Sequence, residues 1–418
     1  MNPTHEFFFS ASERVLRTGS AAATEVEMRY FVNDDAVAKL LWARLNASRA
    51  DLVDVAMAIH IADRLAVRDA LRYVRPERRF HIRVPVRQLA LWQRPDVQKS
   101  LSEMLTFGTG DYWEIEFSQR DSRLRFAEQQ DSLFAVRSDE PVRVNLFSGG
   151  LDSFAGNVVA LSEHREVHYV CVSATPSPRQ GACQVEQIQY LRSQPHRSLT
   201  HLRFPASLKA ASGVEQEHSR RTRGFIFLAL GSVSALSAGA EGFFLYGNGI
   251  GAVNLPCERT PVGIPNSRSV HPETLGRMAH FIELLTQKPF SIEYPCIFKT
   301  KAEMCAHPVV QSAAEAIRAT FSCDGFPVRH AKMPQCGVCT SCILRRLALD
   351  SCGLHEIDRD GYVPHLPNRR GRPLSGYSKS CCACMARTAR NGSALLHGSG
   401  WPRSGRQPDH GSRNSRDT

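Results

Sequence analysis

The chain has 418 residues, enough for two domains with cores of their own, and its 42% hydrophobic and 22% charged residues are ordinary for a globular protein. Its formal net charge at pH 7 is +11, but residues 361–418 hold ten Lys or Arg and two Asp, so the first 360 residues carry only +3. The composition therefore argues against a fibrous chain and against a nucleic-acid-binding face on the folded body.

Two features of the sequence bear on where the protein resides. The N-terminal stretch MNPTHEFFFSASERV contains acidic residues and no long apolar run, so we expect no signal peptide and a cytoplasmic protein. The most apolar stretch, residues 225–240, is shorter than the roughly 20 residues of a membrane span, so we expect a buried helix packed on a sheet. Thirteen cysteines in such a chain should be reduced thiols or metal ligands.

Residues 1–140 mix strand-like and helical segments and predict an α+β domain of unknown role. The strand-like segments are 25–32, 78–86 and 111–118, and apolar residues at helical spacing predict a helix over 51–71. Within that helix Asp63 and Arg64 could form a site, but we expect an ordinary surface or interface pair.

Residues 141–358 alternate strands with helices. We expect strands at 142–147, 167–173, 199–204 and 242–247 and helices at 153–164, 183–193, 222–239, 272–287 and 308–320. This order predicts an α/β domain, a parallel sheet with helices on both faces. Ligands of such sheets bind outside the carboxyl ends of the strands.

Residues 359–418 form a basic tail rich in Gly, Ser, Arg and Pro, which we expect to be disordered. Three cysteines close together, Cys381, Cys382 and Cys384, fall in this tail. In an unstructured segment we do not expect them to form a metal site.

The first chemical motif is VNLFSGGLDSFAG, residues 144–156, a strand, a glycine loop and a helix in sequence. Backbone amides at a helix N-terminus favour an anion, and glycines let the backbone approach phosphate closely. The Ser148 and Ser153 hydroxyls would add donors, while Asp152 should cap the helix and orient the loop or bind Mg²⁺. The alternative is a simple Gly-Gly turn with Asp as N-cap.

Strand–Ser-Gly-Gly-x-Asp-Ser–helix resembles the signature of the PP-loop ATP pyrophosphatases. The resemblance implies that the loop binds the pyrophosphate end of ATP and that attack at the α-phosphorus leaves an adenylated substrate. The implied ATP-binding residues are Ser148, Gly149, Gly150, Leu151, Asp152 and Ser153.

The second motif is a run of closely spaced cysteines in FSCDGFPVRHAKMPQCGVCTSCILRR. Its four cysteines are Cys323, Cys336, Cys339 and Cys342. Four thiolates suit tetrahedral Zn²⁺, and because no position stays open, the metal would be structural. An iron–sulfur cluster or unrelated buried cysteines are the alternatives. Three basic residues nearby should help to hold the thiolate charge: Lys332, Arg345 and Arg346.

A PP-loop followed by this cysteine run and Arg-Arg resembles the 7-cyano-7-deazaguanine synthases, called QueC, over about residues 142–354. The resemblance implies adenylation of the carboxylate of 7-carboxy-7-deazaguanine, then transfer to ammonia to give an amide and, after a second activation, a nitrile. Carried over, the four cysteines bind zinc. The sequence departs from those synthases at Arg223-Gly224, where they have Arg-Asn, and lacks their Tyr-Pro-Asp-Cys-Arg stretch, so the substrate stays open.

The long N-terminal region, with GNGIGAVNLP, SVHPETL and FKTKAEM, is similar to the QueC-like component of Qat anti-phage defence systems, QatC. That similarity implies protein partners encoded in a defence operon. A partner-protein amine could then receive the activated acyl group in place of ammonia.

Other candidate site residues follow from their chemistry. Arg223, Lys299 and Lys301 are the best cations for polyphosphate or for charge developing at the α-phosphorus, so Asp152, Arg223 and Lys301 are our catalytic candidates. Surface charges are the alternative for the three cations. Asn248 and Asn254 could form hydrogen bonds with the edge of a purine-like ring, or they could be turn residues. His271, before a proline, is expected to start a helix.

Two other functions use the same motif. A tRNA-modifying PP-loop enzyme would need a tRNA-binding surface, which the near-neutral body does not favour. A non-catalytic nucleotide-binding scaffold of a defence complex would bind ATP without turning it over.

Overall fold

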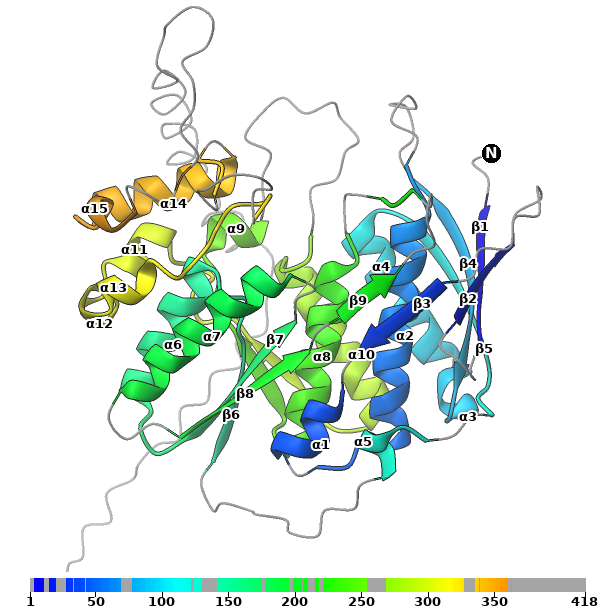
Figure 1. Ribbon diagram of the computed structural model, residues 1–418. Helices are drawn as coiled ribbons and strands as arrows, with labels where there is room; N and C mark the ends of the chain where they lie inside the picture. The colour runs from blue at the N-terminus through cyan, green and yellow to red at the C-terminus, as the bar shows by residue number, and fades with distance from the viewer. Residues whose placement is uncertain are drawn as a thin grey trace, which may run out of the picture. The chain divides into compact units, whose positions relative to one another are not determined.

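The structure is a computed structural model (Figure 1). It describes residues 4–10, 15–19, 28–32, 34–41, 43–68, 77–121, 124–129, 141–174, 177–194, 198–204, 206–209, 215–217, 221–253, 268–326, 335–337, 339–358 and 362. Asn254, Lys332 and the three tail cysteines lie outside these residues, as does the predicted tail apart from Tyr362.

The N-terminal region forms a six-stranded mixed sheet in the order β5-β4-β1-β2-β3-β9. Its strands are β1 (Thr4–Phe9), β2 (Val15–Gly19), β3 (Met28–Val32), β4 (Arg79–Val86), β5 (Tyr112–Gln119) and β9 (Ala206–Lys209). β1, β4 and β5 run parallel, and the other neighbours pair antiparallel. Because side chains alternate across a strand, Phe80, Ile82 and Val84 of β4 all enter the core.

Two long helices pack on this sheet. They are α2 (Ala47–Leu65), which contacts β4, and α4 (Pro95–Thr109), which contacts β5. Asn46 caps α2 by accepting from the Arg49 amide at 3.0 Å, so the helix starts before residue 51 and ends at Leu65, six residues before the predicted end. The short helices of this region are α1 (Asp35–Leu41), α3 (Leu89–Trp92) and α5 (Phe126–Gln129).

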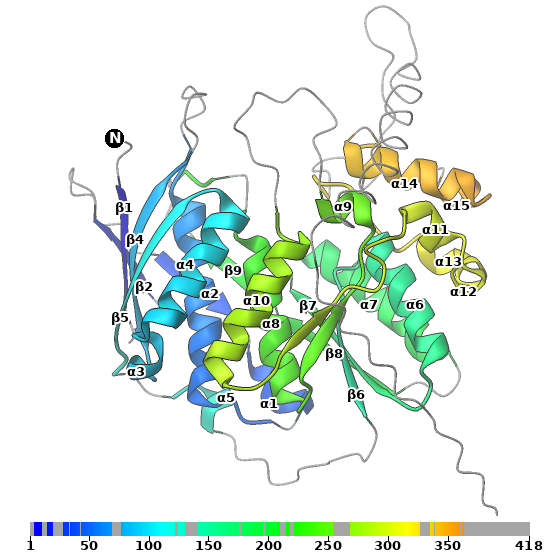
Figure 2. The same cartoon turned by 180° about the vertical axis from the view of Figure 1, so that it is seen from behind.

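The second sheet is entirely parallel, in the order β11-β10-β6-β7-β8. Its strands are β6 (Val142–Leu146), β7 (His168–Ala174), β8 (Leu199–Phe204), β10 (Gly242–Leu245) and β11 (Ser291–Glu293). Two pairs of helices accompany it, α6 (Leu151–Glu163) with α7 (Pro178–Ser193) and α8 (Arg223–Ser237) with α10 (Pro272–Thr286) (Figure 2). The two pairs belong to different hydrophobic clusters, one for each face of the sheet, so the α/β prediction is confirmed.

The apolar stretch around residues 225–240 is α8, which packs on β6, β7 and β10 and is largely buried. Among the described residues, no helix is long and apolar enough to cross a membrane. The prediction of a buried helix on a sheet is confirmed. The prediction of one helix over 308–320 is wrong, because the chain breaks at Ala313 into α12 (Pro308–Ser312) and α13 (Ala314–Ile317).

The two sheets share a core. β9 follows β8 in the chain but pairs with β3 of the first sheet, α2 contacts α8, and α4 contacts α10. One hydrophobic cluster contains Phe80 of the first sheet and Leu146 of the second. The N-terminal region therefore supports the helices that lie on one face of the parallel sheet.

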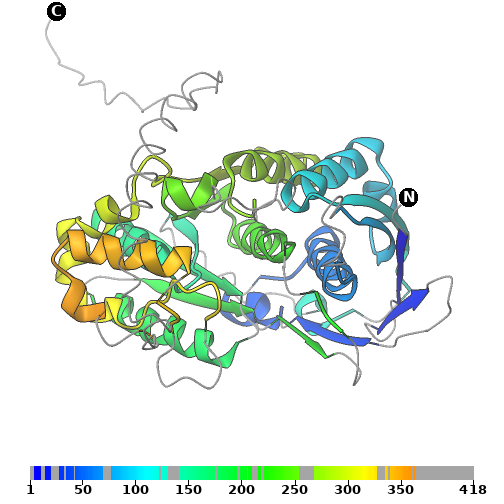
Figure 3. The ribbon, with the colours of Figure 1, turned by 90° about the horizontal axis from the view of Figure 1, so that it is seen from above.

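The remaining helices are α9 (Gly249–Val253), α11 (Lys301–Cys305), α14 (Thr340–Ser351) and α15 (His355–Asp358). α11 contacts both α6 and α14, and α12 also contacts α6. Figure 3 shows these late helices, in yellow and orange, gathered beside the green α6 and α7. The last part of the described chain thus returns to the helix that follows β6.

Candidate functional site

The loop 148–150 joins the carboxyl end of β6 to the first turn of α6. Gly149 has φ +82°, a left-handed conformation that favours glycine, and Gly150 is the N-cap residue of α6. A Cβ on Gly149 would lie 2.9 Å from Cγ of Gln184 and 3.0 Å from the Phe321 ring. Since the first amides of a helix have no intrahelical acceptor, this loop and helix start offer N–H groups to an anion.

Hydrogen bonds to the hydroxyls of Ser148 and Ser153 hold the loop in its conformation. The Ser148 amide donates to Oγ of Ser153 at 3.1 Å, and that hydroxyl donates to the Leu146 carbonyl at 3.4 Å. The Gly150 amide donates to Oγ of Ser148 at 3.2 Å. Ser153 is buried and holds the loop, whereas Ser148 is exposed and keeps its hydroxyl proton for a ligand.

Asp152 does not cap α6, contrary to expectation, because Gly150 occupies the N-cap position. Its carboxylate instead forms an ion pair with the Lys301 ammonium and accepts a hydrogen bond of 2.6 Å from Nδ2 of Asn248. The carboxamide oxygen of Asn248 accepts from the Gly251 amide at 2.9 Å. Both ends of Asn248 are therefore engaged within the protein, which favours a turn role over reading a ring edge.

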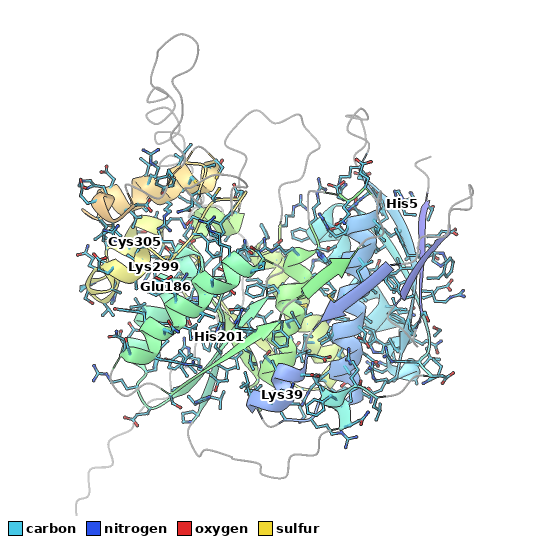
Figure 4. The ribbon with its side chains drawn as sticks, viewed as in Figure 1. His5, Lys39, Glu186, His201, Lys299 and Cys305 are labelled. Carbon is cyan, nitrogen blue, oxygen red and sulfur yellow. The ribbon has the colours of Figure 1, made fainter. Side chains whose placement is uncertain are left out.

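Lys301 reaches Asp152 because of how α11 begins. Thr300 and Glu303 form a capping box at the start of this helix, which fixes the backbone at Lys301 and Ala302 between them. Lys301 is 9% exposed, whereas Lys299 is exposed and lies on the preceding turn (Figure 4). Of these two candidate cations, Lys301 is the one that the fold brings to the Asp152 carboxylate.

Arg223 is the first residue of α8, and its side chain is exposed. The start of this helix is anchored by Asp63, whose Oδ2 accepts from the amide and the hydroxyl of Thr222 at 3.1 and 2.8 Å. Asp63 is thus a buried residue at the contact of α2 with α8, where it also forms an ion pair with Arg78. A Cβ on Gly224 would lie 2.3 Å from Cβ of Ser269, so the packing here requires glycine after Arg223.

His271 is the N-cap residue of α10, and its Nδ1 accepts from the Glu273 amide at 3.2 Å. The prediction that it starts a helix is confirmed. Burial and the nearby Arg268 lower its pKa.

Two glutamines of α7 reach the loop and a third reaches the cysteine segment, and the sequence did not predict any of them as site residues. Gln184 donates to the Ser148 carbonyl at 2.9 Å, and Gln187 donates to the Gly149 carbonyl at 3.0 Å. Gln180, one turn earlier, donates to the Phe326 carbonyl at 3.2 Å. Their spacing along a helix was visible in the sequence, but nothing in that spacing indicated which carbonyls they would meet.

The four predicted cysteines form one cluster. The sulfur atoms of Cys323, Cys336, Cys339 and Cys342 all lie within 4.8 Å of one another. Amide groups of the same segment point at two of these sulfurs, from Cys336 to Cys323 at 3.4 Å and from Cys339 to Cys336 at 3.3 Å. Four thiolates at this separation fit a tetrahedral zinc ion of about 2.3 Å Zn–S distance and leave no position for substrate.

Arg345 does not serve the thiolates. It is fully buried, with hydrogen bonds of 2.9 Å to Asp358, 2.7 Å to Thr320 and 3.2 Å to the Ile317 carbonyl. Arg346 bonds the Gly337 carbonyl at 3.4 Å, and so contacts the backbone of the cysteine segment rather than sulfur. The prediction that Arg345 holds thiolate charge is wrong, because its guanidinium pairs with the buried carboxylate of Asp358. For Arg346 it stays a prediction.

The cysteine segment also touches the loop. Phe321, two residues before Cys323, forms a parallel bridge with Gly150, and its amide bonds the Gly149 carbonyl at 3.3 Å. Its ring stacks on Phe326 at 4.4 Å between centroids. The cysteine segment and the glycine loop are therefore adjacent.

A buried histidine lies below the loop. Nε2 of His201 on β8 is 2.9 Å from Oγ of Ser173, which donates to the Phe147 carbonyl at 2.7 Å (Figure 4). Because the serine proton is used, Nε2 must be the donor and carries a proton. Burial, followed by Arg203 and Arg192, lowers the pKa of His201 to about 3.

One known protein family matches the part of the chain that contains the loop and the cysteine cluster. Residues 142–353 match the family described as "Queuosine biosynthesis protein QueC". The comparison with curated proteins found no match. The matched region runs from the start of β6 to just beyond α14, so it contains the loop, Lys301 and all four cysteines. Since this region makes up half of the chain, the protein belongs to the QueC family.

Proposed function

We propose that this protein uses ATP to adenylate the carboxylate of a 7-carboxy-7-deazaguanine-like molecule and then transfers the acyl group to nitrogen. Membership of the QueC family supports ATP-dependent carboxylate activation by a PP-loop enzyme. The observation that carries the proposal is the Asp152–Lys301 ion pair beside a glycine loop that opens a helix. This arrangement supplies the fixed donors and the nearby positive charge that a pyrophosphate leaving group needs.

ATP would bind with its polyphosphate at the start of α6. The loop amides and the helix dipole attract the anion, and the Ser148 hydroxyl adds a donor. Lys301 offers a cation next to this position, and Asp152 offers a carboxylate for the Mg²⁺ that accompanies ATP. The absence of a Walker-type lysine fits a loop that holds departing pyrophosphate rather than a transferred γ-phosphoryl group.

The proposed reaction has two steps, adenylation of the carboxylate and transfer of the acyl group to nitrogen. A substrate carboxylate oxygen attacks the α-phosphorus, the bond from this phosphorus to the bridging oxygen breaks, and pyrophosphate leaves with the electron pair. A nitrogen nucleophile then attacks the acyl carbon, AMP leaves, and the nitrogen loses a proton. Lys301 and Arg223 are proposed to stabilise the charge that develops around the α-phosphorus.

The nitrogen acceptor and the partners belong to the same proposal. Ammonia as acceptor would give the amide and, after a second activation, the nitrile. An amine of a partner protein would give a covalent conjugate, which the similarity of the N-terminal region to the QueC-like component of Qat systems supports. We propose an anti-phage defence role in the cytoplasm on that similarity.

The test is a turnover assay with ATP, Mg²⁺ and 7-carboxy-7-deazaguanine, with and without ammonium, following pyrophosphate and AMP. We expect equal amounts of both products, and none when 7-deazaguanine without the carboxylate replaces the substrate. Arg223→Met should lower the rate, whereas Arg318→Met, at an exposed arginine of the α13 C-terminus, should not. Bound ATP without pyrophosphate release under any acceptor would overturn the proposal in favour of a nucleotide-binding scaffold.

A further inference from the structure

One face of α7 carries three buried carboxamides. Gln180, Gln184 and Gln187 are 7%, 2% and 0% exposed. Burying a carboxamide is unfavourable unless it forms hydrogen bonds. A chain that needed only packing at these positions would gain more from Leu or Met, so the polar groups indicate another requirement.

Each of these carboxamides donates from Nε2, while two of the three acceptor oxygens have no partner among the described residues. Gln184 and Gln187 give their Nε2 groups to carbonyl oxygens, whereas Oε1 of each is buried without a hydrogen-bond partner among the described residues. Turning either amide over would place its oxygen against a carbonyl oxygen. The orientation is therefore fixed by the need to donate to the loop.

Holding the carbonyls determines where the loop amides point. In a trans peptide the C=O and the following N–H point in opposite directions. Gln184 draws the Ser148 carbonyl towards α7, so the Gly149 N–H is directed away from α7. Gln187 does the same to the Gly149 carbonyl and thus to the Gly150 N–H, which donates to the hydroxyl of the exposed Ser148. The glutamines set the peptide planes of the segment that is to bind phosphate.

Gln187 also reaches the cysteine segment. The same Nε2 that bonds the Gly149 carbonyl lies 2.9 Å from the carbonyl of Ala319. The Phe321 amide adds a second bond to the Gly149 carbonyl. One carboxamide therefore connects the loop with the chain that leads to Cys323.

We propose that Gln184 and Gln187 are positioning residues for ATP, which fix the loop carbonyls against α7 so that the Gly149 amide, and the Ser148 hydroxyl that the Gly150 amide holds, face the pyrophosphate. The inference rests on the proposed function only in taking ATP as the ligand. The glutamines touch no reacting atom; they act through the peptide planes at Ser148 and Gly149. Gln187 additionally holds the loop against the cysteine segment.

The test compares ATP binding by Gln184→Met and Gln187→Met with binding by wild type. Methionine keeps the length of the side chain but cannot donate, so a loop carbonyl loses its partner and the peptide can rotate. Gln189→Met is the matched control, because Gln189 lies on the exposed side of the same helix. Binding is measured by calorimetry with a non-hydrolysable ATP analogue, together with the zinc content and the melting temperature of each variant.

We expect each buried substitution to weaken ATP binding about tenfold or more, with zinc retained and the control within twofold of wild type. A lower melting temperature with unchanged ATP affinity would mean a purely structural role and would overturn the proposal. If Gln187→Met does not fold, Gln184→Met decides, since Gln184 contacts the loop without the bond to Ala319. Because binding needs no carboxylate substrate, a wild type that binds ATP but releases no pyrophosphate would contradict the proposed reaction alone.

Discussion

The Lys301 ammonium is paired with the Asp152 carboxylate, although the two residues are 149 positions apart in the chain. The Lys301 side chain is 10% exposed and that of Asp152 19%, so each largely replaces the water that the other has lost. Asn248 holds the second carboxylate oxygen. The glycine loop at the start of α6 is thus connected to α11 and to the turn after β10 by one acidic side chain.

Replacing Lys301 by Met should reduce kcat/KM for pyrophosphate release at least about a hundredfold, because the transition state loses a desolvated cation. Lys301→Arg should restore part of the activity, since it keeps the charge. Lys288→Met, at an exposed lysine after α10, serves as the control and should stay within twofold of wild type. Equal rates for Lys301→Met and wild type would contradict the catalytic assignment.

The sequence predicted the parts of the site that are local in the chain. The strand–loop–helix around Gly149 and the spacing of the cysteines involve residues close together in the chain. A sequence motif can therefore predict them. The pairing of Asp152 with Lys301 and the donation from Gln184 to Ser148 join distant segments. Such contacts depend on how helices pack on the sheet, which a single sequence does not display.

For the fold as well, the sequence predicted the local features and missed those that join distant segments. The alternating strands and helices after residue 141 were predicted because each has its own periodicity. The strand β9 was not, since its four residues gain their pairing only when β3 lies beside them. Asp63 was expected at a surface or interface pair, but its partners Arg78 and Thr222 come from other elements. Burial of a charged residue is a tertiary property.

Replacing Gly149 by Ala should weaken ATP binding and lower the free energy of unfolding by about 1–3 kcal/mol. The left-handed backbone disfavours a Cβ by roughly 1–2 kcal/mol, and the new atom would press against Gln184 and Phe321. Gly276→Ala is the control, because nothing lies within 4 Å of a Cβ at that exposed position of α10. It should be neutral or stabilise by up to about 1 kcal/mol. Denaturant unfolding and ATP titration of both variants check this prediction.

Replacing Cys336 by Ser should remove most of the bound zinc and lower the melting temperature, since a structural zinc site contributes directly to folding. Cys183→Ser is the control, because Cys183 packs against the same cluster without being one of its four clustered thiols. Metal analysis of the purified wild type should give one zinc per chain. Iron in its place, or equal zinc loss from the Cys183 variant, would contradict the assignment.

His201 should make the protein less stable in acid. Its pKa is about 3 in the folded protein and about 6.5 when unfolded, so between these values the unfolded chain binds more protons and stability falls as the pH falls. At pH 5 the loss approaches about 2 kcal/mol, using 1.36 kcal/mol per pH unit below 6.5. His201→Gln keeps a neutral donor near Ser173 but cannot titrate, so its stability should decline less between pH 7.5 and 5. Urea unfolding of both proteins across this range checks the prediction, and parallel curves would show that His201 is not the group responsible.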